Sequence, residues 1–175
     1  MDEPAAASTT PADFTIRTAT VDDAAALAAL IDALNVSEGD PVGYVTPATV
    51  SRDLSTGVIT VIIAEAGTEA LAYCLFHFGY ESTYAASGLY IVDLFVREEY
   101  RGRGIGRALI AEVCRRAKAA GGCFVWWTAK PNNQLANAAY ARLLAHAEPV
   151  IAHAVFDDAF EALVAQGEAR RAGRR

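Results

Sequence analysis

The amino-acid sequence predicts an α/β (α+β) fold, a single domain whose mixed β-sheet is flanked by helices. Segments with the two-residue period of strands alternate with segments of helical period along most of the chain. A length of 175 residues suffices for one domain with a sizeable core, and 53% of the residues are hydrophobic. We expect this domain at residues 13–165, between a disordered lead at 1–12 and a flexible basic tail at 166–175.

The first predicted elements are a strand and two helices. Residues 14–17 alternate in polarity as a strand does, and Thr20 is suited to cap a helix at 20–34. A Thr-Pro start signal then predicts a short second helix at 46–54. A glycine-containing loop separates the two helices.

Three strands form the centre of the predicted sheet. Residues 58–66 are rich in β-branched side chains and almost entirely apolar, which is typical of a buried strand. Residues 71–80 return as the second strand of a hairpin. Residues 89–96 follow a turn, and their hydrophobicity indicates a central strand.

The remaining chain alternates between helix and strand. A helix at 105–120 stops at a Gly-Gly pair, as helices often do. Beyond it we expect a strand at 123–129, a helix at 133–147, a last strand at 150–156, and a closing helical turn or two at 157–166.

Composition and charge exclude several classes of function. A formal net charge of -6 and a pI near 5.0 argue against nucleic acid as a partner and suit a cationic substrate. The sequence has no apolar window long enough to cross a membrane, so no membrane partner is expected. Three cysteines without CxxC spacing indicate reduced thiols in a cytoplasmic protein, and the three histidines lack metal-ligand spacing, so no metal is predicted.

The stretch "YRGRGIGRALI", residues 100–110, predicts an anion-binding site. It lies between an apolar strand and a helix, and a helix begins with about four unpaired N–H groups and a partial positive charge. Its glycines let a ligand approach the backbone, and its arginines add positive charge. The spacing matches neither the dinucleotide-binding G-x-G-x-x-G nor the G-K-S/T of a P-loop, which leaves Arg101-x-x-Gly104-x-Gly106.

That arrangement after "DLFV" resembles the acyl-CoA pyrophosphate loop of the GNAT superfamily of N-acetyltransferases. A second motif agrees with it, because Asn133, Ala136, Tyr140 and Leu143 resemble the family's Asn, Ala, Tyr and Leu pattern. Offsets of three and seven residues place Asn133, Ala136 and Tyr140 on one helical face. Asn133 also suits a plain helix cap, and Tyr140 a core position.

The resemblance implies a mostly antiparallel mixed sheet, a β-bulge in the strand at 89–96, and acetyl-CoA as co-substrate without a metal. It assigns the backbone N–H of Leu94, at the bulge, to the thioester oxygen, and the hydroxyl of Tyr140 to the departing thiolate. The remaining cofactor contacts that it implies come from the same strand, the glycine loop and the helix at 133–147: Phe95, Val96, Arg101, Gly102, Arg103, Gly104, Ile105, Gly106, Arg107, Asn133 and Ala136.

Residues 71–106 resemble the spermidine/spermine (diamine) acetyltransferase branch, with one departure. That branch has Glu-Asp where this chain has Val92-Asp93, and the missing glutamate is the general base. Adjacent strand residues point to opposite faces, so Asp93 does not simply replace it. A base from Glu81, Glu65, Asp40 or a water chain remains open, as does an amine of low pKa. Asp93, Glu81 and His77 are the candidates for substrate binding.

Two classes of function follow. The first is an enzyme that acetylates a primary amine of a small molecule, such as a polyamine or an amino acid. The second is a non-catalytic acyl-CoA-binding or regulatory domain that has lost its base, and a protein or peptide N-acetyltransferase is a further alternative. The resemblance also implies a homodimer. The sequence leaves the acceptor amine, the general base and the acyl chain length undetermined.

Overall fold

The computed structural model describes residues 14–143 and 145–172. The lead predicted at 1–12 therefore lies outside the described residues. The chain divides into two compact units, Met1–Ala136 and Asn137–Arg175. Within the first unit the elements are β1 (Thr15–Thr18), α1 (Ala24–Glu38), α2 (Pro47–Ser55), β2 (Thr60–Ala66), β3 (Glu69–Glu81), β4 (Ala86–Val96), α3 (Ile105–Ala119) and β5 (Phe124–Trp127).

Two further helices and three short 3₁₀ turns complete the described chain. Helix α4 (Gln134–Ala141) begins in the first unit and ends in the second, and α5 (Asp157–Ala172) lies in the second. The 3₁₀ turns are η1 (Val21–Asp23), η2 (Ser82–Tyr84) and η3 (Glu98–Tyr100).

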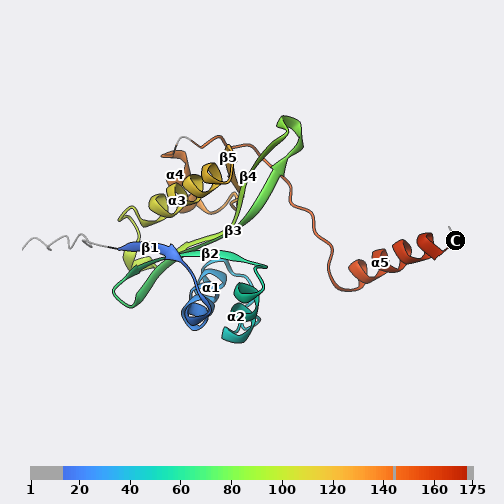
Figure 1. Ribbon diagram of the computed structural model, residues 1–175, viewed down its shortest axis with the longest axis horizontal. Helices are drawn as coiled ribbons and strands as arrows, with labels where there is room; N and C mark the ends of the chain where they lie inside the picture. The colour runs from blue at the N-terminus through green and yellow to red at the C-terminus, as the bar shows by residue number, and fades with distance from the viewer. Residues whose placement is uncertain (1–13, 144, 173–175) are drawn as a thin grey trace, which may run out of the picture. The chain divides into compact units, whose positions relative to one another are not determined.

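The sheet has five strands in the order β1-β2-β3-β4-β5. The first three pairings are antiparallel, whereas β4 and β5 run parallel and are joined through α3 (Figure 1). A parallel neighbour needs such a crossover, because a tight turn reverses the direction of the chain. This mixed and mostly antiparallel sheet with flanking helices confirms the predicted fold class.

Helices α1 and α2 cover one face of the sheet, and α3 covers the other (Figure 1). Because side chains alternate along a strand, each face has its own core. On the α1 side, Val61, Ile63, Tyr73 and Phe95 pack with residues of α1 and α2, including Leu27, Leu30 and Val50. The alternate positions Ile62, Ala72 and Cys74 are also buried, on the face of α3.

Local signals set the ends of the helices much as the sequence predicts. Thr46 caps α2 by accepting a hydrogen bond from the Thr49 N–H at 3.1 Å, and Pro47 occupies the first helical position. Helix α1 ends at Gly39, whose φ of 72° is left-handed and suits glycine. These helices are therefore specified by their own residues.

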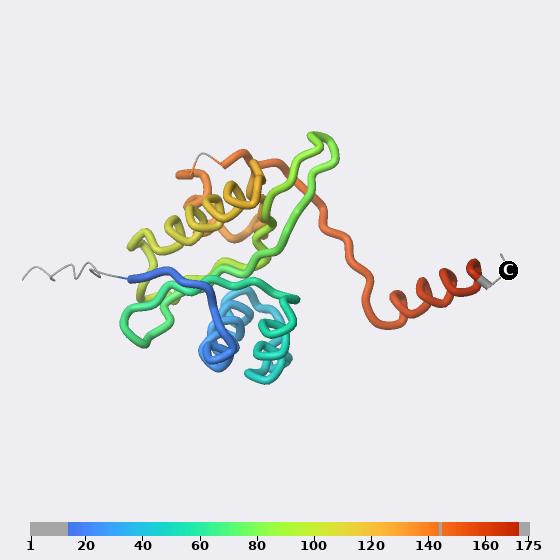
Figure 2. Tube along the Cα trace, in the orientation of Figure 1, coloured from blue at the N-terminus to red at the C-terminus, as the bar shows by residue number. Residues whose placement is uncertain are grey.

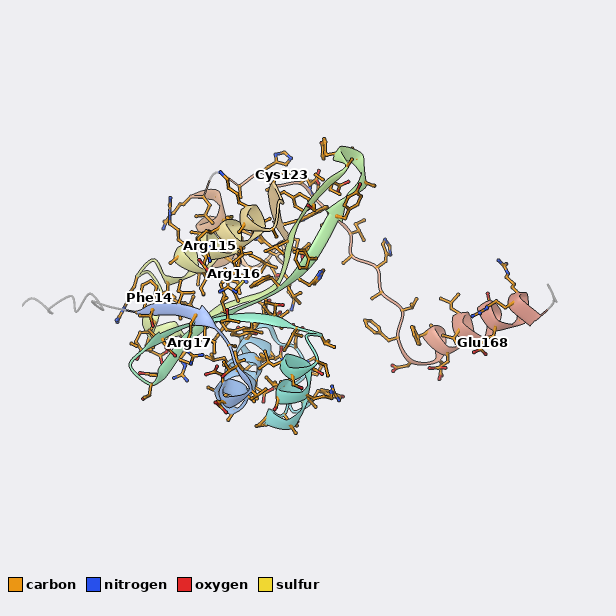
Figure 3. All side chains as sticks on the ribbon, viewed as in Figure 1. Phe14, Arg17, Arg115, Arg116, Cys123 and Glu168 are labelled. Atoms are coloured by element: carbon orange, nitrogen blue, oxygen red, sulfur yellow. The ribbon has the colours of Figure 1, made fainter. Side chains whose placement is uncertain are left out.

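Charged side chains join β1 to the elements beside it (Figure 3). Arg17 donates hydrogen bonds to Glu65 at 2.9 Å and to Asp23 at 2.7 Å. The hydrogen bonds from Arg17 lower the pKa of Asp23 to about 2. Arg116 of α3 donates to Glu112 at 2.8 Å and to the Thr18 hydroxyl at 2.9 Å. Both networks lie near the surface.

The last predicted strand is wrong. Residues 145–156 contain no strand or helix, and the trace runs through them without regular structure (Figure 2). Val150 and Ile151 are 53% and 83% exposed. The apolar, β-branched pattern of 150–156 suits a strand, but such a preference takes effect only where a partner strand and a packed face are present.

Two predicted helix ends also differ from the structure. Helix α4 ends at Ala141 and not at 147. In place of a closing turn or two, α5 forms a helix of 16 residues that includes residues 166–172 of the predicted basic tail. Residues 173–175 lie outside the described part. Among the described helices, none combines the length and apolar character needed to cross a bilayer.

Candidate active site

Strand β4 carries one residue more than its partner β3 near its middle. Leu75 lies opposite Asp93 and Phe76 lies opposite Ile91, so Val92 has no partner in the register. An extra residue of this kind is a β-bulge, which bends and twists the strand. The bulge predicted for this strand is present, but it lies at Val92, two residues before the predicted Leu94. Its position depends on the register with β3, which the sequence of β4 alone does not contain.

The second neighbour of β4 ends at the same point. Strand β5 pairs with residues 88–91 of β4, and the last pair is Ile91 with Trp127. Among the described residues, no strand pairs with residues 92–96 on that side. The sheet thus opens between β4 and β5 at the bulge, and one edge of β4 presents its backbone groups.

Two hydrogen bonds show which backbone groups lie on this open edge. The Arg97 N–H donates to the Leu71 carbonyl at 3.0 Å, so Arg97 faces β3. In an antiparallel strand the backbone groups of successive residues point to alternate sides, so Phe95 also faces β3, while Leu94 and Val96 face the open edge. The Val96 carbonyl accepts from Arg101 Nε at 3.0 Å, which agrees with this assignment. Of the predicted backbone contacts, Leu94 and Val96 suit a ligand on this edge and Phe95 does not.

The glycine loop leads from this edge into α3. Gly102 and Gly104 have φ values of 75° and 83°, which favour glycine, and Gly104 is the residue before the first helical position. Ala108 N–H donates to the Gly104 carbonyl, so the helical ladder begins there. The N–H groups of Ile105, Gly106 and Arg107 precede that first bond and are the groups an anion would meet.

The arginines of the loop differ in how they are held. Arg101 is fixed at both ends, because its N–H donates to the Glu98 carbonyl at 3.1 Å and its side chain bonds Val96. The Arg101 N–H is therefore already bonded and does not suit the phosphate contact predicted for residues 101–107. The Arg103 guanidinium lies 5.3 Å from the centre of the Tyr100 ring. Arg107 is exposed on the first turn of α3. The loop thus places three cations around the start of one helix.

A strand with one open edge, followed by a glycine loop and a helix, matches a known family in sequence as well as in structure. The sequence profile described as the Acetyltransferase (GNAT) family matches residues 29–145. The chain belongs to the GNAT acetyltransferase family. No curated protein matches the sequence of the chain.

Solved structures share the fold at low identity. An integron cassette protein from the mobile metagenome of V. cholerae has a TM-score of 0.72 at 20% identity, covering 86% of this chain and 97% of its own. A ribosomal-protein-alanine N-acetyltransferase from Brucella melitensis has a TM-score of 0.69 at 16% identity, covering 83% and 100%. An aminoglycoside acetyltransferase from an uncultured soil metagenomic sample, in complex with sisomicin, has a TM-score of 0.69 at 18%, covering 82% and 95%.

Members of the GNAT family generally use acetyl-CoA, and the residues of this chain fit that co-substrate. A Cβ at Gly102 or Gly104 would meet no atom within 4 Å, so the positive φ, and not crowding by the protein, calls for glycine at these positions. The unpaired N–H groups at the start of α3 and the surrounding arginines suit a pyrophosphate. The N–H groups of Leu94 and Val96 suit the amide-containing arm that follows it.

Asn133 lies at the start of α4 and acts as its cap. Its Oδ1 accepts a hydrogen bond from the Ala136 N–H at 3.0 Å. Its Nδ2 donates to Glu38 Oε1 at 2.7 Å, which joins the start of α4 to the end of α1. Lys130 strengthens this link by donating to Asp40 at 3.0 Å. The capping alternative is therefore confirmed, and the contact of Asn133 with the cofactor stays a prediction.

Tyr140 lies on α4 at an offset of seven residues from Asn133. Helical geometry therefore puts it on the face of Asn133 and Ala136, and its side chain is half-buried. Tyr140 belongs to the second unit of the chain, and both its role and that of Ala136 toward acetyl-CoA stay predictions.

Asp93 follows the bulge and is largely buried. Its Oδ2 accepts a hydrogen bond from the Tyr73 hydroxyl at 3.2 Å. Burial raises the pKa of Asp93 above its ordinary value, and the Tyr73 hydrogen bond offsets part of that rise. Burial, with the nearby Asp93 charge, also raises the pKa of Cys74 to about 12. Sequence reasoning missed Tyr73 as the partner of Asp93, although its place on an aromatic strand was visible.

The other two predicted substrate residues lie along the β3–β4 hairpin. His77 is exposed, donates from Nδ1 to the Phe78 carbonyl, and stacks on Tyr90 with ring centres 5.3 Å apart. Glu81 lies at the hairpin tip, where its carboxylate accepts from the Thr83 N–H at 3.0 Å, which lowers its pKa. Its register partner Ala86 precedes the bulge by six residues, or roughly 20 Å of strand. His77 is therefore near the bulge, and Glu81 is not.

Proposed function

We propose that this chain transfers an acetyl group from acetyl-CoA to a primary amine of a small molecule. The observation that carries the proposal is the open edge of β4. There the Leu94 and Val96 N–H groups, the glycine loop and the first turn of α3 follow one another within 14 residues, from Leu94 to Arg107. This succession offers one face of backbone donors to an extended, phosphate-bearing ligand.

Each of these groups has a defined task in the reaction. Acetyl-CoA supplies the activated thioester. The N–H groups of Ile105, Gly106 and Arg107 hold the pyrophosphate, and the arginine side chains neutralise its charge. The Leu94 N–H donates to the thioester oxygen as negative charge develops on it during attack by the amine. Tyr140 provides the proton for the leaving sulfur.

The acceptor is an amine that carries positive charge before it reacts. The net charge of -6 favours the approach of cations. Polyamines are candidates because of the sequence resemblance, and aminoglycosides because two neighbours in structure are named as acetyltransferases of that class. The proposal also includes a homodimer and a location in the cytoplasm.

A second candidate is a non-catalytic acyl-CoA-binding domain. It is favoured by Val92, which replaces the glutamate that serves as base in the polyamine branch. A domain of this kind would bind acetyl-CoA through the same loop and turn over no amine.

An amine panel with a free-thiol readout separates these candidates. The panel contains polyamines, amino acids, aminoglycosides and a peptide with an N-terminal alanine, each offered with acetyl-CoA. We expect thiol release with at least one small primary amine. Acetyl-CoA binding by calorimetry without turnover of any amine would favour the binding domain, and turnover of the peptide alone would favour a peptide N-acetyltransferase.

A further inference from the structure

The bulge changes which face of the sheet Asp93 occupies. Before the bulge, Tyr90 lies opposite His77, and their stacked rings show that both point to one face. After the bulge, Asp93 lies beside Tyr73, which packs with α1 and α2. In a regular strand Tyr90 and Asp93, three residues apart, would lie on opposite faces. The extra residue at the bulge shifts the alternation by one, so that Tyr90 and Asp93 lie on the same face.

The β3 residues His77 and Tyr73 lie on either side of the bulge and show that Tyr90 and Asp93 point to the same face of the sheet. These residues lie four apart on β3 and so point to the same side of a strand of period two. Val92, the extra residue of the bulge, adjoins Asp93 and is 48% exposed. The bulge interrupts the alternation from which Asp93 is expected to point away from position 92, and the register with β3 places the Asp93 side chain toward α1.

The other carboxylates considered for the base have partners elsewhere. Glu65 is paired with Arg17 at 2.7 Å, and Asp40 with Lys130 at 3.0 Å. Glu81 caps the turn at the hairpin tip. A carboxylate that already accepts hydrogen bonds from a cation is less available to take a proton from an amine. Asp93 differs from Glu65 and Asp40 because no ion pair to it is found among the described residues, and from Glu81 because it adjoins the bulge.

We propose that Asp93 is the general base that takes the proton from the attacking amine. This inference rests on the proposed acetyl transfer and deepens it. The Asp93 carboxylate removes one proton from R–NH₃⁺, and the freed electron pair forms the N–C bond as the C–S bond breaks. The second proton leaves nitrogen and the sulfur gains one, which gives the amide and free CoA. Asp93 then releases its proton to water, so each turnover liberates one H⁺.

The surroundings of Asp93 suit this role. The Tyr73 hydroxyl fixes one carboxylate oxygen, Oδ2, and Asp93 is not fully enclosed. The titratable groups near it on the sheet are Tyr73 and Cys74, with His77 and Tyr90 on the far side of the bulge. The apolar residues of α1 and α2 that pack with Tyr73 and Phe95 include Leu27, Leu30 and Val50. Burial raises the pKa of Asp93, which makes its carboxylate a stronger base than an exposed aspartate.

The experiment removes the carboxylate from position 93 and then introduces one at position 92. Asp93→Asn should lower kcat with the best amine of the panel by about 10² or more, and remove the acidic limb of the kcat/KM profile. Because position 92 adjoins Asp93 at the bulge, Val92→Glu in the Asp93→Asn chain should raise kcat at least tenfold above that of Asp93→Asn alone. Glu161→Gln on the exposed α5 is the matched carboxylate control and should leave kcat unchanged.

Acetyl-CoA affinity by calorimetry and Tm confirm that each variant is folded. A loss of kcat without a change in the pH profile, and without rescue by Val92→Glu, would assign Asp93 a structural role and overturn the inference. If the native chain turns over no amine, the proposed function fails and the inference that rests on it fails as well. In a chain that does turn over an amine, an Asp93 carboxyl pKa at or below the ordinary value of about 3.9 by NMR titration would overturn the inference alone.

Discussion

The two halves of β4 are both largely apolar and have different neighbours. Residues 88–91 pair with β3 on one side and β5 on the other, and Leu89 and Ile91 are buried. Residues 92–96 pair with β3 only. The doubly paired half contributes stability, and the singly paired half leaves two N–H groups, on Leu94 and Val96, for a ligand. The function proposed for this strand thus depends on the point at which its second partner ends.

Proline substitutions test this difference most strongly. Leu94→Pro removes an N–H on the open edge, so the ladder with β3 stays complete and the chain should fold. Loss of one oxyanion donor should lower kcat by about 10² to 10³. Phe95→Pro is the matched control, because its N–H faces β3 and its loss should unfold the chain. A folded Leu94→Pro enzyme with native turnover in the thiol-release assay would contradict the assignment of the two edges.

A pair of glycines tests the loop that follows the open edge. Gly104→Ala places a side chain at a φ of 83°, and Gly57→Ala does so at a φ of 71° in the turn between α2 and β2. Each substitution should cost about 1 kcal/mol of unfolding free energy. Only Gly104→Ala should also weaken acetyl-CoA binding, by about tenfold or 1.4 kcal/mol in calorimetry. Equal acetyl-CoA affinities for the two folded variants would refute the loop assignment.

Features that depend on residues close together in the sequence could be predicted from the sequence. The glycine loop, the start of α3 and the Asn133 cap follow from residues a few positions apart. The Glu38 partner of Asn133 could not be predicted, because it lies 95 residues away. The bulge at Val92 and the Tyr73–Asp93 contact depend on the register between β3 and β4. The strand predicted at 150–156 failed for the same reason, since a strand exists only with its partner.

Tyr140 tests whether the open edge serves chemistry or binding alone. Tyr140→Phe keeps the ring and removes only the hydroxyl, so acetyl-CoA affinity should stay within about twofold of native. Because general-acid help is worth about 10² to 10⁴ and water can replace part of it, kcat should fall by about tenfold. Calorimetry and the thiol-release assay measure the two effects. An unchanged kcat would make Tyr140 a packing residue.

The smallest expected effect comes from Val92→Glu in the native chain. Val92 is 48% exposed and adjoins Asp93 at the bulge, so a glutamate there would meet the second ammonium of a diamine while Asp93 accepts the proton. An exposed ion pair is worth about 0.5 kcal/mol, so kcat/KM for spermidine or putrescine should rise about two- to threefold. Val92→Gln, which has nearly the same shape and no charge, should show no such gain, and monoamines should not distinguish the two variants. Equal kcat/KM values for the two variants with every polyamine would count against a polyamine acceptor and would leave the assignment of Asp93 intact.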